Sequence, residues 1–177
     1  MHSEIHEAFG WCLSSSSSRD ALNIVDGRGE FEQFGPHYSR RTRDAKTFTG
    51  CGQEVVLVHA SGRAVWAVVY QKTPAARGTG ASRGRSVGSD QRPRMLWRNM
   101  CFRNLGAGVS SGLIVEATSA TYLFWRQKYD VLPEERLRTE IGIDKVRSTN
   151  PGYCYLKAGW ERDRIVRKKL YLYAPPR

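Results

Sequence analysis

The sequence predicts an α+β domain whose mixed, largely antiparallel central sheet carries helices on both faces. Three observations predict it: a β-branched hairpin pattern, one long amphipathic helix in the second half, and strand-like segments on both sides of that helix. Strands interrupted by helices in this way are typical of a layered α+β sheet. The 177 residues suit a single domain spanning residues 1–177.

The first clear elements are two strands that form an antiparallel hairpin. Residues 54–60 are rich in β-branched side chains, Ser61 and Gly62 supply a turn, and residues 63–71 continue with Val and aromatic residues. The preceding residues 1–35 are polar and mix isolated apolar positions with glycines. We therefore expect an irregular N-terminal segment there, and residues 21–34 can supply at most a short strand or helix.

The second half alternates strands with helices. Apolar residues from Leu113 to Trp125 recur at three- and four-residue spacing, which predicts a helix that ends before Pro133. The other predicted elements are a strand at 95–102, a strand at 137–141, a polar segment at 144–160 with a turn at Asn150-Pro151-Gly152, and a final strand at 164–173. The predicted order is β-β-β-α-β-α-β.

Charge is distributed unevenly along the chain. The net charge is +11, but residues 1–35 hold six acids and two bases, so the remainder is strongly cationic. Residues 73–93 break all periodicity with glycine, proline and arginine, and we interpret them as a basic flexible loop. Such a field attracts polyanions. RNA, DNA and coenzyme A are all anionic, so charge alone does not choose among them.

Several classes of protein are disfavoured. No apolar run approaches the roughly 20 residues needed to span a bilayer, so we expect no membrane partner. The N-terminus lacks the basic start and apolar stretch of a secretory signal, which favours a cytoplasmic location. The four cysteines are widely spaced, which suggests free thiols and neither a zinc site nor a disulfide framework.

A glycine-rich loop lies between a predicted strand and the predicted helix. Residues 103–108 read Arg-Asn-Leu-Gly-Ala-Gly, and Ser110 and Ser111 follow at the start of the helix. The first-turn N–H groups of a helix have no intrahelical partner and lie at the positive end of the macrodipole, so they bind anions. Arg103 and the two serines could add hydrogen bonds to phosphate. A glycine-rich connection without a ligand is the competing interpretation.

This loop resembles the Q/R-x-x-G-x-G/A acetyl-CoA loop of the GCN5-related N-acetyltransferases (GNAT), and Tyr155 to Trp160 resembles their downstream Y-x-x-x-G-F/W element. The resemblance covers residues 54–173 and implies a GNAT-like fold with acetyl-CoA or a related acyl-CoA as cofactor. The sequence departs from the family at Ser148 and Pro151, and the proline disfavours a regular helix up to Tyr155. The implied cofactor-binding residues are Arg103, Gly106, Ala107, Gly108, Ser110, Ser111 and Tyr155.

A His-Tyr-Ser cluster at residues 37–39 precedes the hairpin. His37 is a candidate base and Tyr38 a proton relay, although a His-Tyr pair in a loop is more often structural. This cluster, with Gly152 to Trp160, is similar to the Mom DNA-modification proteins of bacteriophage Mu and related phages. Those proteins convert the N6 amine of adenine to a bulkier amide-type derivative, which protects the genome from restriction.

The Mom resemblance implies a further set of residues. His37, Tyr38, Ser39, Asp144 and Tyr153 match the family's active-site positions, and Arg98 falls on its cofactor side. The cytoplasm would then be that of a bacterial host. Iron is an additional cofactor candidate through the family's tyrosine region, although no residues here have metal-ligand spacing. The expected DNA contacts are Arg40, Arg41, Arg43, Arg77, Arg83, Arg85 and Arg92.

Acting on N6 requires an extruded or single-stranded base, and an aromatic pocket would hold it. Candidates for that pocket are Tyr38, Trp66, Trp97 and Tyr153, with ordinary core packing as the competing interpretation for the tryptophans. Three functions remain open at this point. They are a DNA adenine acyl-type modifier, a GNAT enzyme that acts on a protein or small-molecule amine, and a non-enzymatic basic DNA-binding protein.

Overall fold

The structure is a computed structural model, and it describes residues 5–40, 42, 45–72, 94–146 and 148–176. The strands are β1 (Glu7–Ala8), β2 (Trp11–Ser14), β3 (Gln53–His59), β4 (Ala64–Lys72), β5 (Met95–Asn104), β6 (Arg138–Gly142), β7 (Glu161–Val166) and β8 (Lys169–Tyr173). The helices are α1 (Arg19–Asp26), α2 (Ser110–Tyr129) and α3 (Tyr153–Lys157), with a 3₁₀ helix η1 at Gly29–Phe34. This α+β arrangement confirms the predicted fold class.

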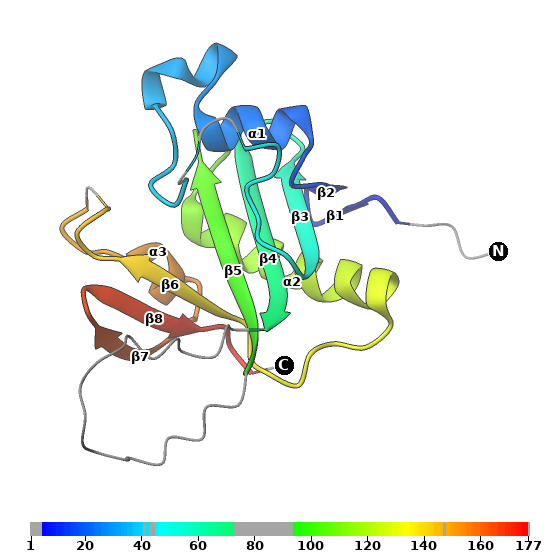
Figure 1. The fold of residues 1–177 in the computed structure, drawn as a ribbon, viewed down its shortest axis with the longest axis vertical. Helices are drawn as coiled ribbons and strands as arrows, with labels where there is room; N and C mark the ends of the chain where they lie inside the picture. Colours follow the sequence, from blue (N-terminus) through cyan, green and yellow to red (C-terminus); the bar gives the residue numbers. More distant parts are fainter. Residues whose placement is uncertain (1–4, 41, 43–44, 73–93, 147, 177) are drawn as a thin grey trace, which may run out of the picture.

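All the described strands join one open sheet in the order β1-β2-β3-β4-β5-β6-β8-β7 (Figure 1). Every neighbouring pair is antiparallel except β5 and β6, which run parallel. A parallel pair needs a long crossover, and α2 supplies it. The sheet is therefore mixed but largely antiparallel, as predicted.

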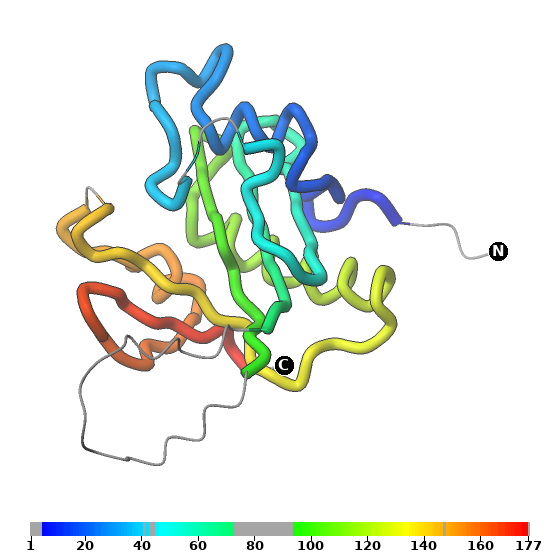
Figure 2. Tube along the Cα trace, viewed as in Figure 1, coloured from blue at the N-terminus to red at the C-terminus, as the bar shows by residue number. Residues whose placement is uncertain are grey.

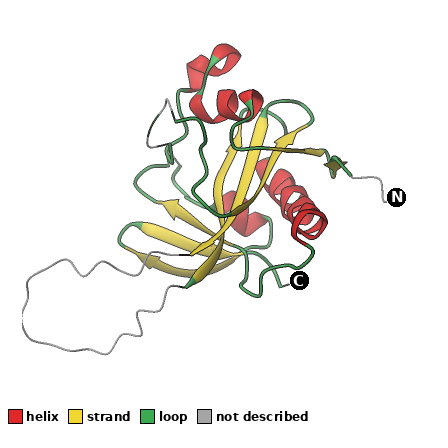
Figure 3. Cartoon of the chain, turned by 45° about the vertical axis from the view of Figure 1, so that its right-hand side comes forward, coloured by secondary structure: helices red, strands yellow, loops and turns green. Residues whose placement is uncertain are grey.

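Two apolar clusters cover opposite faces of the sheet. One holds Trp66, Trp97 and Trp125 with α2 and α3, and the other packs Ile24 and Val25 of α1 against β3, β4 and β5. Helices therefore lie on both faces, which Figure 3 shows from the side. No helix in the described ranges is long and apolar enough to cross a bilayer.

The N-terminal segment was predicted to be irregular, and this prediction was wrong. Residues 5–35 contain β1, β2, α1 and η1. Ser18 caps α1 by accepting a hydrogen bond from the Ala21 N–H, and Gly27 ends the helix in the left-handed region at φ 62°. A Cβ at Gly27 would lie 2.1 Å from the Gly35 carbonyl oxygen. Gly27 therefore lets the chain after η1 pass close to the end of α1.

The final strand also differs from its prediction. Instead of one strand at 164–173, the chain forms a hairpin of β7 and β8. Its turn residues Arg167 and Lys168 have φ values of 47° and 61°. Glycine or asparagine usually occupies such positions, so the sequence carries no turn signal there. By contrast, the predicted turn before Tyr153 is present, and α3 begins two residues after Pro151.

Candidate active site

The site forms where the parallel strands β5 and β6 separate. They pair only at Arg98 with Arg138 and at Asn99 with Thr139, and then diverge (Figure 1). On the other side of β5, Ala67 pairs with Cys101 and Val68 with Asn99. Met100 is therefore the extra residue of a β-bulge, which bends a strand locally. A cavity of about 130 Å³ fills the gap between the strands.

The cavity collects residues from distant parts of the sequence. Its lining includes Tyr38, Asn99, Cys101, Thr139, Cys154 and Tyr155. Tyr155 belongs to α3 on one side of the sheet, whereas Tyr38 follows η1 on the other. Figure 2 traces the segment around residues 35–40 alongside the C-terminal half of β5. The two motifs that the sequence singled out separately therefore line one cavity.

Asn99 forms hydrogen bonds with several of the residues that line the cavity. Its Oδ1 accepts hydrogen bonds from Tyr155 Oη at 2.7 Å and Thr139 Oγ1 at 3.3 Å, while its Nδ2 donates to the Ala67 and Cys101 carbonyls, both at 3.0 Å. Burial raises the pKa of Tyr155 well above its ordinary value. The phenol is therefore neutral and acts in the site as a hydrogen-bond donor.

His37 is neutral and presents an accepting nitrogen. Its Nδ1 accepts from the Ser39 N–H at 3.3 Å and lies 2.7 Å from Ser39 Oγ, so the ring proton is on Nε2. Burial, and then the charge of Arg103, lower the pKa of His37 to about 4, while a hydrogen bond to the Phe102 carbonyl partly offsets them. Its ring packs on Tyr38 with centroids 4.4 Å apart.

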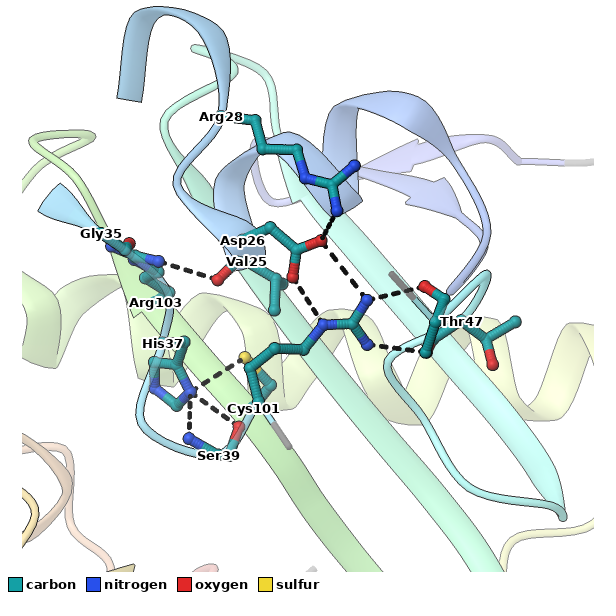
Figure 4. A network of polar contacts seen from close by, with 11 residues as sticks. Val25, Asp26, Arg28, Gly35, His37, Ser39, Thr47, Cys101 and Arg103 are labelled. Carbon is teal, nitrogen blue, oxygen red and sulfur yellow. Dashed lines mark hydrogen bonds and ion pairs between the residues drawn. The ribbon is translucent and has the colours of Figure 1, made fainter. Parts of the chain in front are cut away.

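The Cys101 thiol lies beside this histidine but is not activated by it. Its Sγ is 3.8 Å from His37 Nδ1 (Figure 4), and the residue is 3% exposed. Burial raises the pKa of Cys101 to about 12, so the thiol stays protonated at neutral pH. Burial likewise raises the pKa of Tyr38 to about 12. The base candidate in this cluster is therefore His37.

Arg103 was predicted to bind the cofactor, and the structure corrects this prediction. Its guanidinium donates to the Val25 carbonyl at 2.9 Å, the Phe34 carbonyl at 3.2 Å and the Gly35 carbonyl at 2.6 Å. The residue is 7% exposed. Because a guanidinium buried against three carbonyls has few donors left for phosphate, Arg103 instead fixes the backbone just before His37.

Arg40 was predicted to contact DNA, and this prediction is also wrong. Its Nε donates to Asp26 Oδ1 at 2.5 Å, and its two terminal nitrogens donate to the Thr47 and Ala45 carbonyls, each at 2.7 Å (Figure 4). The two charged side chains are 5% and 1% exposed. Arg40 therefore ties the chain after His37 to the C-terminal end of α1.

The glycine-rich loop has the predicted place between a strand and a helix. Asn104 holds it, because its Oδ1 accepts from the Gly106 and Ala107 N–H groups at 3.1 and 2.9 Å. Its Nδ2 donates to the Gly108 carbonyl at 2.8 Å and to Ser110 Oγ at 2.9 Å. Val109 is the N-cap of α2 and makes no side-chain cap. The N-terminus of this 20-residue helix is thus open to an acceptor.

Comparison of the chain with protein-family models, with curated proteins and with solved structures found no match. The geometry of the site is therefore the basis for any functional conclusion.

Three predicted residues lie apart from the cavity. Arg98 lies near the start of β5, roughly 20 Å along the strand from the loop after Asn104, and pairs with Glu140 at 3.5 Å. Asp144 is exposed in the turn after β6, and Tyr153 is 52% exposed beneath Lys157. The structure therefore does not bring Asp144 and Tyr153 to His37, and it separates Arg98 from the cofactor loop.

The tryptophans are core residues, and Trp66 and Trp97 are both fully buried. Of the four aromatic residues predicted to hold an extruded adenine, only Tyr38 therefore lines the cavity. Ser110 and Ser111 are the first two residues of α2, and Ser39 contacts His37. Six predicted DNA contacts, Arg41, Arg43, Arg77, Arg83, Arg85 and Arg92, lie outside the described residues. Among the described residues, no group of three or more His, Cys, Asp or Glu could hold a metal ion.

Sequence reasoning missed Asn99, Thr139 and Cys101. All three are buried and lie on β5 or β6. Asn99 carried one usable signal, because an amide side chain in the middle of a strand, two residues from Trp97 and from Cys101, needs buried hydrogen-bond partners. Thr139 and Cys101 are ordinary strand residues, so only the structure identifies them.

Proposed function

We propose that this chain is an acyl-CoA-dependent transferase of the GNAT type that modifies the N6 amine of adenine in DNA, as the Mom-type proteins it resembles do. One observation carries the proposal: Tyr38 of the His-Tyr motif and Tyr155 of the GNAT-like element line the same cavity. A cavity lined by residues from both sides of the sheet suits a two-substrate transfer.

The acyl-CoA fits the loop before α2. The open N-terminus of α2 and the backbone of Gly106 to Ser111 would hold its pyrophosphate, with Asn104 keeping the loop in shape. When bound, acyl-CoA supplies an activated thioester. The Gly106 and Ala107 N–H groups already donate to Asn104 Oδ1. They would bind phosphate only by sharing their protons between that oxygen and a phosphate oxygen.

The chain's own groups would assist transfer to a weak nucleophile. The N6 lone pair is delocalised into the ring, so proton removal is needed. His37 Nδ1 would accept that proton after exchanging its contacts with the Ser39 N–H and Oγ for it, and would pass it to solvent. The new bond joins N6 to the acyl carbon as the carbon–sulfur bond breaks. Tyr155 Oη would turn its one proton from Asn99 Oδ1 to the sulfur, which leaves as the thiolate.

The proposal is tested by the nucleosides in DNA from cells that express the protein. We expect a mass-shifted deoxyadenosine in the wild type that is absent in His37→Ala. His59→Ala is the matched control, since His59 Nδ1 lies 2.8 Å from Ser61 Oγ in the same local arrangement, but neither neighbour of His59 lines the cavity, whereas Tyr38 next to His37 does. This variant should keep the modification.

Two other outcomes would favour the rival functions. Unshifted nucleosides together with newly acetylated lysines would favour a GNAT enzyme acting on protein amines. Failure of saturating acetyl-CoA to raise the melting temperature would favour a non-enzymatic basic DNA-binding protein, because a ligand that binds the native state must stabilise it.

A further inference from the structure

The sheet carries a second polar feature beside the active site. On β8, Leu170 and Leu172 face the core, so Lys169 and Tyr171 face the opposite side. Tyr171 pairs with Glu140 of β6, which lies on that same side. No described helix covers this part of the sheet, because α1 packs on β3 and β4 while α2 and α3 share the core cluster (Figure 1). We call it the outer face, and its residues are Arg98, Arg138, Glu140, Arg164, Lys169 and Tyr171.

A single carboxylate on the outer face gathers three cations from three strands. Glu140 lies 3.5 Å from Arg98, 2.9 Å from Arg138 and 3.2 Å from Lys169. One carboxylate neutralises one of these charges and leaves two in excess. The Nε atoms of Arg98 and Arg138 are also buried and have no acceptor among the described residues. The excess positive charge around Glu140 indicates a site for an anion.

The adjoining hairpin continues the positive charge outward. The guanidinium carbons of Arg138 and Arg164 lie 5.7 and 5.6 Å from the centroid of the Tyr171 ring, so both arginines make a cation–π contact with this ring. Arg164 is 59% exposed and lies 3.6 Å from Asp163, and Glu161 is the other acid of the hairpin. The other exposed bases of the hairpin are Arg162, Arg167, Lys168 and Lys169. An exposed β-ribbon with this composition suits a nucleic-acid backbone.

The outer face reaches the candidate active site. A cleft of about 640 Å³ is lined by Arg98, Glu140 and Lys169 and also by Tyr38 and Ser39. A strand whose phosphates lay on the outer face could therefore extend a base toward Tyr38.

We infer that the outer face binds the phosphates of the DNA strand that carries the target adenine. The inference rests on the proposed function, and it assigns to β6, β8 and β7 the DNA contacts that Arg40 does not make. A single strand fits this surface better than a duplex does, because its bases are unpaired. They are free to turn toward the cleft and to stack on the exposed side chains of Tyr38 and Arg164.

The test measures binding by fluorescence anisotropy, without acyl-CoA, to one labelled oligonucleotide offered single-stranded and as a duplex. Arg164→Gln with Lys169→Gln should weaken single-strand binding roughly ten-fold or more at low salt, and should lower the salt slope by about 1.4. Arg19→Gln with Arg126→Gln removes the same charge from exposed positions on α1 and α2 and should leave both values near wild type. Arg164→Lys with Lys169→Arg should restore binding.

Equal losses in the two glutamine pairs would overturn the inference, because they would indicate a non-specific charge effect. Wild-type affinity in Arg164→Gln with Lys169→Gln, or no binding by the wild type, would also overturn it. Tighter binding of the duplex would contradict the single-strand assignment. If the binding results hold while no modified deoxyadenosine forms, the docking surface stands and the proposed reaction fails. If modified deoxyadenosine forms while the variant binds as tightly as the wild type, the reaction stands and the docking surface fails.

Discussion

Arg40 Nε donates to Asp26 Oδ1 across 2.5 Å, and both side chains are almost completely buried. This pair joins the last residue of α1 to the chain just after His37. The His37 N–H donates to the Val25 carbonyl at 2.8 Å, and Arg103 grips the chain just before it. The backbone on either side of His37 is therefore held in place by Arg103 and Arg40, and both arginines contact residues of α1.

Asp26→Asn should destabilise the protein by roughly 3 kcal/mol, because it leaves the buried Arg40 charge without its counter-ion. Urea unfolding followed by tryptophan fluorescence measures this change. Arg28→Gln removes the other cation that contacts Asp26, at 3.1 Å, but that side chain is 47% exposed. We expect a cost below about 1 kcal/mol for it. Equal costs in the two variants would contradict the assignment of Arg40 as the anchor.

The sequence predicted the hairpin, the long helix and the loop before it, because each depends on local periodicity or on glycine placement. The predicted roles of side chains were wrong where contacts between residues far apart in the sequence determine the environment of the side chain. Arg40 and Arg103 were predicted to bind ligands because they are basic residues near the candidate motifs. Their partners Asp26 and the Val25 carbonyl belong to α1, a helix that the sequence did not predict. The sequence assigned both Tyr153 and Tyr155 to the site, but only Tyr155 is buried, whereas Tyr153 is 52% exposed.

The stability of the protein should fall as pH drops from about 6.5 to 4, with His37 as one identifiable source. Its pKa is about 4 in the folded state, below the usual 6.5, so the unfolded chain binds more protons in this window. The contribution of His37 is up to about 3 kcal/mol. His37→Asn should therefore flatten the dependence of the unfolding free energy on pH. A curve parallel to that of wild type would contradict burial of a neutral His37.

Tyr155→Phe should slow acyl transfer while leaving DNA affinity unchanged, because it removes the donor that reaches Asn99 and the cavity. A lost hydrogen bond of this kind also costs about 1 kcal/mol of stability. Steady-state rates and oligonucleotide binding separate the two effects. Tyr153→Phe is the control, since Tyr153 is half-exposed, and it should behave as wild type. A slower rate in Tyr153→Phe alone would favour the sequence-based assignment of Tyr153 over that of Tyr155.

Gly106→Ala should reduce the thermal stabilisation that acetyl-CoA gives. Gly106 has a φ of 99°, and a Cβ there would meet only Arg63 at 3.9 Å, so the direct cost is backbone strain of roughly 1 kcal/mol. Gly29→Ala also imposes a positive φ, of 60°, with open space, and it lies in η1 outside the loop. Comparing melting temperatures with and without acetyl-CoA isolates the effect on binding. An equal ligand-induced shift in both variants would argue against phosphate binding at this loop.

The most direct test of the account is the intact mass of a single-stranded oligonucleotide after incubation with purified protein and isotopically labelled acyl-CoA. Our account predicts a mass increase equal to the labelled acyl group when the oligonucleotide contains one adenine. It predicts no increase when hypoxanthine, which lacks the N6 amine, replaces that adenine, or when His37→Asn replaces the wild type. An unchanged mass with the adenine oligonucleotide, or the same increase with hypoxanthine, would contradict it.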